Sequence, residues 1–384
     1  MDTGFRAVCE GAAGQWQLPA LAVGMSLGGT EDVVALGCDP GTRFRIASIT
    51  KPLTATLALS LLGPDEAVRV WPDDVRVRHL LSHTSGFDCE LPDRDQLRFG
   101  EGDDALARCV AELPGVRRWV GAEEIWSYAN TGYWLAGALA AERAGETYEE
   151  ALAHRVLEPA GLADTSFAPP DLDGTGPDAL PEPYPRARRP SGGLTSTVAD
   201  LLRFGRHHLA DPASARLRAA YGRPLGGVYG LGLAGERVGG LEVWGHGGSW
   251  GGFESSFLVV PERHAVFAGL TNASNGSKAL RQIEDEFLRA ATGSARPAPG
   301  YRTLPAETYR ALVGTYANAD GAYEVDWPEG SDGLVVGFED EEAIGLALDD
   351  RTFQVPVGAH AGELFDFPRP GLARFGSRLA ERTS

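Results

Sequence analysis

The sequence is poor in lysine, cysteine and methionine, and it lacks a long uninterrupted apolar run. Lys51 and Lys278 are its two lysines among 35 basic residues, so arginine supplies nearly all of the positive charge. The net charge is −18 and no basic cluster occurs, which disfavours nucleic acid and anionic membranes as partners. A lysine retained in such a chain is the one basic side chain type that can readily give up a proton.

The few cysteines lie far apart, at Cys9, Cys38, Cys89 and Cys109. This spacing predicts neither a disulfide framework nor a zinc site, and we expect no metal and no other cofactor. The first residues do not form a charged-then-apolar leader, and no segment is long enough to cross a bilayer. We therefore expect a cytoplasmic location.

What the sequence does contain is a Ser-x-x-Lys element, Ser48 to Lys51, at the start of an apolar stretch. Pro52 is tolerated only in the first turn of a helix, so a helix must begin close to Ser48. Five leucines between positions 53 and 62 make this helix apolar on nearly all sides, which predicts that it is buried. Residues three apart share a helical face, so the Lys51 amine is expected beside the Ser48 hydroxyl.

The Ser48–Lys51 pair predicts nucleophilic catalysis. A serine hydroxyl is a poor nucleophile until a neighbouring base takes its proton. A lysine can serve as that base if burial or nearby cations lower its pKa. A chance match is the competing interpretation, with a probability of roughly one in ten for this composition.

Two further segments have patterns suited to a site. Tyr128 and Asn130 lie two residues apart before a predicted helix, so both side chains could face one cleft. A tyrosine can shuttle a proton if an ammonium lowers its pKa, and the asparagine can hold the lysine or a substrate carbonyl. Glycines in residues 245–253 would let a ligand approach a strand edge, where amides can stabilise an oxyanion. Residues 79–86, with two histidines, are interpreted as structural.

The pattern of apolar runs and turns predicts two domains. Residues 1–293 form the larger one, with strands expected at 18–27 and 33–36 and a helical insertion at about 70–205. A linker rich in Pro, Gly and Ala follows at 294–305. Residues 306–384 alternate short strand-like runs with turns, which predicts a small β-barrel or sandwich.

Three motifs together carry a family resemblance. Ser48-Ile49-Thr50-Lys51, Tyr128-Ala129-Asn130 and His246-Gly247-Gly248 resemble, in order and rough spacing, the motifs of the penicillin-recognising serine enzymes. The chain is most similar to the class C β-lactamase-like branch, which also holds esterases, D-amino-acid peptidases and acyltransferases. Supporting stretches at 77–86, 190–196 and 229–232 agree with this resemblance.

The resemblance implies a fold for each part of the chain. The larger part would have an α+β, β-lactamase/transpeptidase-like fold, in which helices flank an antiparallel sheet and a helical insertion borders the cleft. Residues 306–384 resemble the lipocalin-like barrel appended to some members.

The same resemblance implies roles for individual residues. Ser48 would be the nucleophile, and Lys51 and Tyr128 would form the proton-transfer pair. Asn130 would position the reacting groups, and the amides of Ser48 and Ser249 would form the oxyanion hole. The substrate-binding residues would be Asn130, His246, Gly247, Gly248 and Ser249.

One departure from the family pattern affects the expected substrate. Where β-lactamases of this branch carry Lys-Thr-Gly, this chain has a histidine at 246, which replaces a fixed cation by a usually neutral imidazole. We therefore expect a hydrolase that acylates Ser48 with a small-molecule or short-peptide ester or amide, D-amino-acid types included, and that has little β-lactamase activity. Acyl transfer from an ester or thioester to an amine or alcohol, and a catalytically silent binding protein, remain alternatives. The oligomeric state stays open.

Two other motif matches are set aside. Residues 247–251 match the Gly-x-Ser-x-Gly elbow of α/β-hydrolases, but that motif needs a helix after the serine, and a strand is expected at 253–261. Residues 230–235 match a dinucleotide fingerprint, but they lead into another strand, with no helix to bind pyrophosphate.

Overall fold

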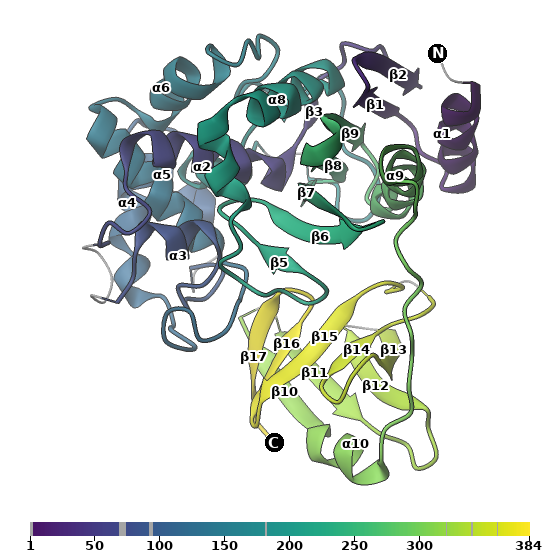
Figure 1. The fold of residues 1–384 in the computed structure, drawn as a ribbon. Helices are drawn as coiled ribbons and strands as arrows, with labels where there is room; N and C mark the ends of the chain where they lie inside the picture. Colours follow the sequence, from purple (N-terminus) through teal and green to yellow (C-terminus); the bar gives the residue numbers. More distant parts are fainter. Residues whose placement is uncertain are drawn as a thin grey trace.

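The structure is a computed structural model, and it describes residues 3–68, 74–91, 95–180, 183–319, 321–338, 341–358 and 360–384. Figure 1 shows a larger domain of helices around a sheet, with a barrel below it. Among the described residues, no helix has the length and apolar character that a bilayer span requires.

An antiparallel sheet forms the centre of the larger domain, with the strand order β2-β1-β9-β8-β7-β6-β5 in the described residues. Its strands are β1 (Leu21–Leu27), β2 (Thr30–Leu36), β5 (Val228–Tyr229), β6 (Ala234–Val238), β7 (Leu241–Trp250), β8 (Phe253–Val260) and β9 (Ala265–Thr271). Strand β1 starts three residues later than predicted, because Gln17, with a φ of 52°, turns the chain out of the first helix. The antiparallel sheet itself is confirmed.

Helices cover both faces of this sheet, as predicted. Helices α1 (Thr3–Gln15) and α9 (Gly276–Thr292) pack on one face. Helix α8 (Val198–Ala210) packs on the other so closely that a Cβ at Gly24 would lie 2.5 Å from a methyl group of Val198. Glycine in β1 thus permits the approach of α8.

A helical part lies beside the sheet, on the side of α8 (Figure 1). It contains α2 (Thr50–Leu61), α3 (Val77–Leu81), α4 (Ala105–Ala111), α5 (Asn130–Ala144), α6 (Tyr148–Leu152) and α7 (Arg189–Gly192). Helix α2 is buried along most of its length, which confirms the prediction made from its leucines. Helix α5 starts at Asn130, earlier than expected, so the Tyr-x-Asn motif spans the junction between an extended segment and a helix.

Residues 314–382 form a closed antiparallel barrel in the described part of the chain, preceded by α10 (Ala306–Leu312). Its strands are β10 (Gly314–Asn318), β11 (Gly321–Asp326), β12 (Gly333–Phe338), β13 (Glu341–Ala347), β14 (Thr352–Gln354), β15 (Leu364–Arg369), β16 (Leu372–Phe375) and β17 (Arg378–Arg382). The barrel prediction is therefore confirmed. Buried side chains, including Tyr316, Phe353, Phe365 and Phe375, fill its interior. Small barrels are commonly filled in this way.

The segment between the two domains is fixed to the larger one by charge. Arg296 is 8% exposed and lies 2.7 Å from a carboxylate oxygen of Glu236, 2.9 Å from Glu284 and 3.1 Å from Asp285. The barrel therefore starts from an anchored point within the linker predicted at 294–305.

The barrel also contacts the larger domain through its last hairpin. Arg374, 5% exposed, forms an ion pair with Asp366 and donates a hydrogen bond of 2.8 Å to the carbonyl of Trp126. Beside it, Leu372 and Leu379 of the barrel pack against Val120. These contacts place the β16–β17 turn against the segment that carries Tyr128.

Candidate active site

Ser48 lies in a short turn, η1 (Ala47–Ile49), that leads directly into α2. Ala47 has a φ of 42°, a left-handed conformation that is uncommon outside glycine. The turn contacts both β7 and α7, so Ser48 lies where the sheet and the helical part meet. Strained backbone of this kind is often found at active sites, where the surrounding structure holds it in place.

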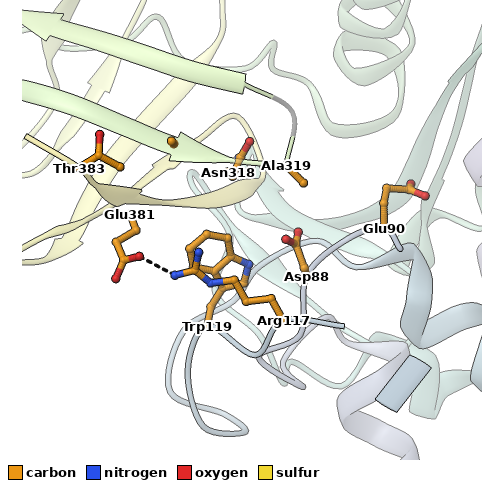
Figure 2. Close-up of a pocket in the computed structure, with 9 residues that line it drawn as sticks. Asp88, Glu90, Arg117, Trp119, Asn318, Ala319, Glu381 and Thr383 are labelled. Carbon is orange, nitrogen blue, oxygen red and sulfur yellow. Dashed lines mark hydrogen bonds and ion pairs between the residues drawn. The ribbon is translucent and has the colours of Figure 1, made fainter. Parts of the chain in front are cut away.

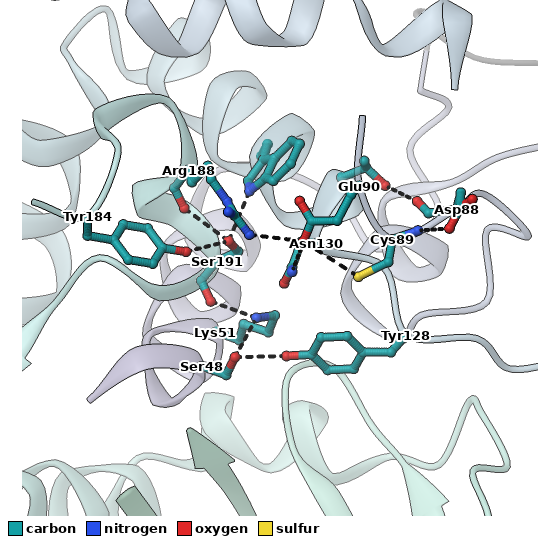
Figure 3. A network of polar contacts seen from close by, with 12 residues as sticks. Ser48, Lys51, Asp88, Cys89, Glu90, Tyr128, Asn130, Tyr184, Arg188 and Ser191 are labelled. Carbon is teal, nitrogen blue, oxygen red and sulfur yellow. Dashed lines mark hydrogen bonds and ion pairs between the residues drawn. The ribbon is translucent and has the colours of Figure 1, made fainter. Parts of the chain in front are cut away.

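Lys51 is fully buried and lies one helical turn beyond Ser48, as the spacing predicts. Its Nζ donates to the Ser48 Oγ at 3.0 Å and to the backbone carbonyl of Ser191 at 2.6 Å. Figure 3 shows this pair within a larger network of polar contacts. The carbonyl from α7 fixes the amine beside the hydroxyl.

Burial lowers the pKa of Lys51 to about 7. The guanidinium groups of Arg188 and Arg378 contribute to this lowering of the Lys51 pKa, while the carboxylate of Glu90 opposes it. The neighbouring Cys89 has little effect at neutral pH, because burial raises its own pKa to about 12 and keeps the thiol uncharged. A substantial neutral fraction of Lys51 is therefore present near pH 7, as a general base requires.

Tyr128 approaches the same hydroxyl from the other side. Its OH group donates to the Ser48 Oγ at 3.0 Å. Burial raises the pKa of Tyr128 well above its ordinary value, so the lowering by an ammonium that was considered from sequence does not occur. Burial is the larger effect, so Tyr128 is protonated at neutral pH and can donate a proton, while Lys51 is the group able to accept one.

The backbone around Tyr128 is held by His83, within the segment that the sequence analysis interpreted as structural. The carbonyl of His83 accepts from the amide of Ser127 at 3.0 Å, and its Nδ1 accepts from the amide of Ala129 at 3.0 Å. The His83 and Tyr128 rings have centroids 4.2 Å apart. The amide of Tyr128 itself donates to the carbonyl of Ser377 in the barrel at 2.8 Å.

Asn130 does not hold the lysine, contrary to one of the roles considered from sequence. Its Nδ2 donates to the Oε1 of Glu90 at 2.6 Å. Glu90 also accepts from Arg188 at 2.9 Å and forms with it a largely buried ion pair. Three separate segments thus meet behind the Ser48–Lys51 pair (Figure 3).

Strand β7 borders the site and brings His246 to it. Burial and the charge of Lys51 lower the pKa of His246 to about 3, so its ring is neutral at physiological pH. The Nε2 of His246 lies 2.9 Å from the OH group of Tyr229. Nδ1 faces the carbonyl of Gly247, which gives this nitrogen the proton and leaves Nε2 to accept from Tyr229.

Gly248 lets β7 run directly beside the nucleophile. A Cβ at this position would lie 2.3 Å from the carbonyl oxygen of Ile46 and 2.9 Å from the amide nitrogen of Ser48. The backbone of Gly248 and Ser249 therefore lies next to the Ser48 amide, in the region that an oxyanion hole would occupy. Gly247 and Ser249 are exposed on the same strand.

A hollow lies beside this site, where the larger domain meets the barrel. Its volume is about 290 Å³. Asp88, Glu90, Arg117 and Trp119 line it from the larger domain, and Ala317, Asn318, Ala319, Glu381 and Thr383 line it from the barrel. Figure 2 shows the Arg117–Glu381 ion pair, 2.6 Å long, that crosses it. Glu90 therefore belongs both to this hollow and to the network behind Ser48.

Two charged side chains and two backbone carbonyls at the site could not be given a role from the sequence. Glu90 and Arg188 come from segments outside the three motifs, and the Ser191 and Ser377 groups act through backbone carbonyls that any residue type supplies. Two stretches of the sequence could have indicated some of these groups. Residues 190–196 contain Ser191 and residues 229–232 contain Tyr229, and both stretches support the family resemblance.

Comparison with known proteins gives matches along most of the chain. The family profile described as Beta-lactamase matches residues 5–291. Penicillin-binding protein 4 of Amycolatopsis lactamdurans is 29% identical over 330 residues, which cover 73% of this chain and 85% of that protein.

Two solved structures are also similar. The structure described as SurE with D-Leu has a TM-score of 0.78 at 23% identity, and the aligned part covers 99% of this chain and 98% of that chain. The likeness in fold therefore includes the barrel. A D-stereospecific amidohydrolase from Streptomyces sp. has a TM-score of 0.60 at 25% identity, with 73% of this chain and 98% of that chain covered.

Proposed function

Because the chain belongs to the beta-lactamase family, we propose that it is a serine hydrolase that forms an acyl-enzyme on Ser48. The observation that carries the proposal is the convergence of two groups on one oxygen. The Lys51 Nζ and the Tyr128 OH both lie 3.0 Å from the Ser48 Oγ, one able to accept a proton and the other able to donate one. This is the arrangement that an activated serine requires.

The reaction proceeds in two steps. Ser48 Oγ attacks the carbonyl carbon while its proton passes to the neutral amine of Lys51, and the negative charge on the carbonyl oxygen is stabilised by the amides of Ser48 and Ser249. Tyr128 gives its proton to the leaving alcohol or amine, and the Lys51 ammonium restores it. Water then attacks the carbonyl carbon of the acyl-enzyme while Lys51 takes its proton. The bond to Ser48 Oγ breaks, the Lys51 ammonium returns a proton to Oγ, and the carboxylic acid leaves.

The substrate is an ester or amide of a small molecule or short peptide. The amidohydrolase with a similar structure is described as D-stereospecific, which supports D-amino-acid amides or esters as the first compounds to assay. The neutral His246 supports weak activity on β-lactams, because the carboxylate of a penicillin would lose its solvation without a cation at this position.

The test is covalent labelling of Ser48. Wild-type protein treated with a fluorophosphonate should carry the label on the peptide containing Ser48, and Ser48→Ala should lose both label and turnover of p-nitrophenyl acetate while keeping its thermal unfolding temperature. Mass spectrometry of the digested protein locates the label. A label on Ser249 or on another serine would refute the assignment, and an unlabelled wild type would favour a silent binding protein.

Replacing His246 by lysine should move selectivity toward substrates that carry a carboxylate. We expect the ratio of kcat/KM for nitrocefin to kcat/KM for p-nitrophenyl acetate to rise about tenfold or more, since a charge-assisted hydrogen bond then offsets the desolvation of the carboxylate. His246→Gln is the control, because it stays neutral and can still accept a bond from Tyr229. Efficient nitrocefin hydrolysis by the wild type would contradict the role given to His246.

A further inference from the structure

Glu90 holds a key site residue in one orientation. The side chain of Asn130 is directed at the Oε1 of Glu90 at 2.6 Å, and Glu90 is 8% exposed. A carboxylate only accepts hydrogen bonds, so the atom of Asn130 that faces it must be Nδ2. The orientation of the carboxamide is therefore determined by chemistry, and its Oδ1 is directed elsewhere.

The free side of the carboxamide faces the reacting groups. Figure 3 shows Asn130 beside the Ser48–Lys51 pair, with Glu90 behind it. Within the described residues, no hydrogen-bond donor reaches the Oδ1 of Asn130, and one hydrogen on Nδ2 remains after the bond to Glu90. Asn130 can thus offer both an acceptor and a donor to the amide of a bound acyl group.

Glu90 is itself held firmly. Arg188 donates to the same Oε1 at 2.9 Å, and its guanidinium lies 5.0 Å from the ring centroid of Trp250, 5.5 Å from that of Trp134 and 5.8 Å from that of Tyr184. A guanidinium surrounded by rings in this way is restricted in its motion. The position of Glu90 is therefore set by a rigid partner rather than by solvent.

Glu90 also acts on the amine of Lys51 through its charge. The titratable and charged groups around this amine are Cys89, Glu90, Arg188 and Arg378, together with Tyr128, Tyr133, His83 and His246. Among them, Glu90 is the carboxylate that opposes burial, while the two arginines act with burial. Loss of Glu90 would remove a negative charge that favours the ammonium, and the neutral amine would gain.

We propose that Glu90 is a positioning residue, which fixes the Asn130 carboxamide toward the cleft and balances the charge around Lys51. The inference rests on the proposed function, since both effects are exerted on acylation of Ser48. It adds a residue outside the three motifs to the machinery of the reaction. Replacement of Glu90 should therefore lower kcat/KM more for some substrates than for others. It should also shift the pH at which kcat/KM rises.

The first consequence is tested with Glu90→Gln on two esters at about pH 9, where Lys51 is neutral in both proteins. We expect kcat/KM for the p-nitrophenyl ester of N-acetyl-D-alanine to fall about 10–100-fold, because the amide of this substrate needs a correctly placed Asn130. The value for p-nitrophenyl acetate, which has no such amide, should fall less than about threefold. Equal losses on both esters would overturn the positioning role.

A double-mutant cycle separates positioning from general damage. In an Asn130→Ala background, Glu90→Gln should cost no more than about threefold further on the amide-bearing ester, because the two residues act as one unit. Additive losses would overturn the proposal. Glu10→Gln is the matched control, since it makes the same chemical change at an exposed position of α1, and it should leave both esters unaffected.

The pH profile gives a readout that a purely structural role would not move. For the wild type, kcat/KM should rise as the pH passes through about 7, because Lys51 must lose its proton to act as a base. In Glu90→Gln this rise should occur at lower pH, since removal of a negative charge lowers the pKa of Lys51. An unshifted rise would overturn the charge role.

Glu90→Asp keeps the experiment decisive if the glutamine variant fails to fold. The shorter side chain retains the charge but withdraws from Asn130, so the pH profile should stay while the amide-bearing ester loses activity. Retention of full activity would refute the positioning role. Failure of the wild type to label at Ser48 would instead refute the proposed function, so the two failures are distinguishable.

Discussion

Lys51→Arg should lower kcat/KM for p-nitrophenyl acetate about as much as Lys51→Met does, by roughly 10²–10⁴-fold. Arginine retains the positive charge but does not give up a proton at any pH used for assays. The Lys51 amine lies 3.0 Å from the Ser48 Oγ and is fully buried, so a permanently charged group there cannot accept the serine proton. Steady-state kinetics and the rate of fluorophosphonate labelling both measure the loss.

The methionine variant serves as the matched control because it keeps an unbranched side chain of similar length without the amine. Thermal unfolding of both variants shows whether the larger guanidinium disturbs the buried site. An arginine variant that retained more than about a tenth of wild-type activity would show that Lys51 acts as a cation and not as the general base.

Removal of residues 299–384 should lower the rate of Ser48 labelling about 10²-fold while the larger domain stays folded. A cut at this point keeps Arg296 with its three carboxylates. It removes Ser377, whose carbonyl accepts from the amide of Tyr128 at 2.8 Å, so the segment that carries the proton donor loses its support. Circular dichroism tests whether the larger domain stays folded, and labelling kinetics measure the loss of rate at Ser48.

A full-length variant provides the control for this truncation. Arg374→Met with Asp366→Leu replaces a buried ion pair by apolar side chains, a change that is often neutral for stability. It removes the 2.8 Å bond to the Trp126 carbonyl. Labelling of Ser48 should therefore be slower than in the wild type, but the loss should be smaller than in the truncated protein. Wild-type labelling rates in both proteins would show that the barrel does not support the site.

The sequence allowed the contact between Ser48 and Lys51 to be predicted because helical spacing is a local rule. Ser48 and Lys51 are three residues apart, and any helix that begins there brings them together. The family resemblance placed Tyr128 at the same oxygen, and the family itself is confirmed, as are the antiparallel sheet and the barrel.

Contacts between distant segments could not be predicted in this way. Glu90 reaches Asn130 across 40 residues, and nothing in the neighbouring residues marks that glutamate. The contact between His246 and Tyr229 likewise joins residues 17 positions apart, and nothing near either residue in the sequence indicates it. The direction of the Tyr128 pKa shift could not be decided from the sequence, because burial, which depends on the whole fold, outweighs one nearby amine.

The contact between the barrel turn and the Tyr128 segment has a consequence for the time at which the enzyme becomes active during its synthesis. Ser127 and Leu379 are hydrogen-bonded although 252 residues separate them. At a translation rate of about 5–20 residues per second, the ribosome needs roughly 13–50 s to pass from one to the other. Throughout that interval the nascent chain already contains Ser48 and Lys51 but lacks the support of the proton donor. If Ser48 is acylated as we propose, a newly made molecule becomes competent for this reaction only after the barrel has folded.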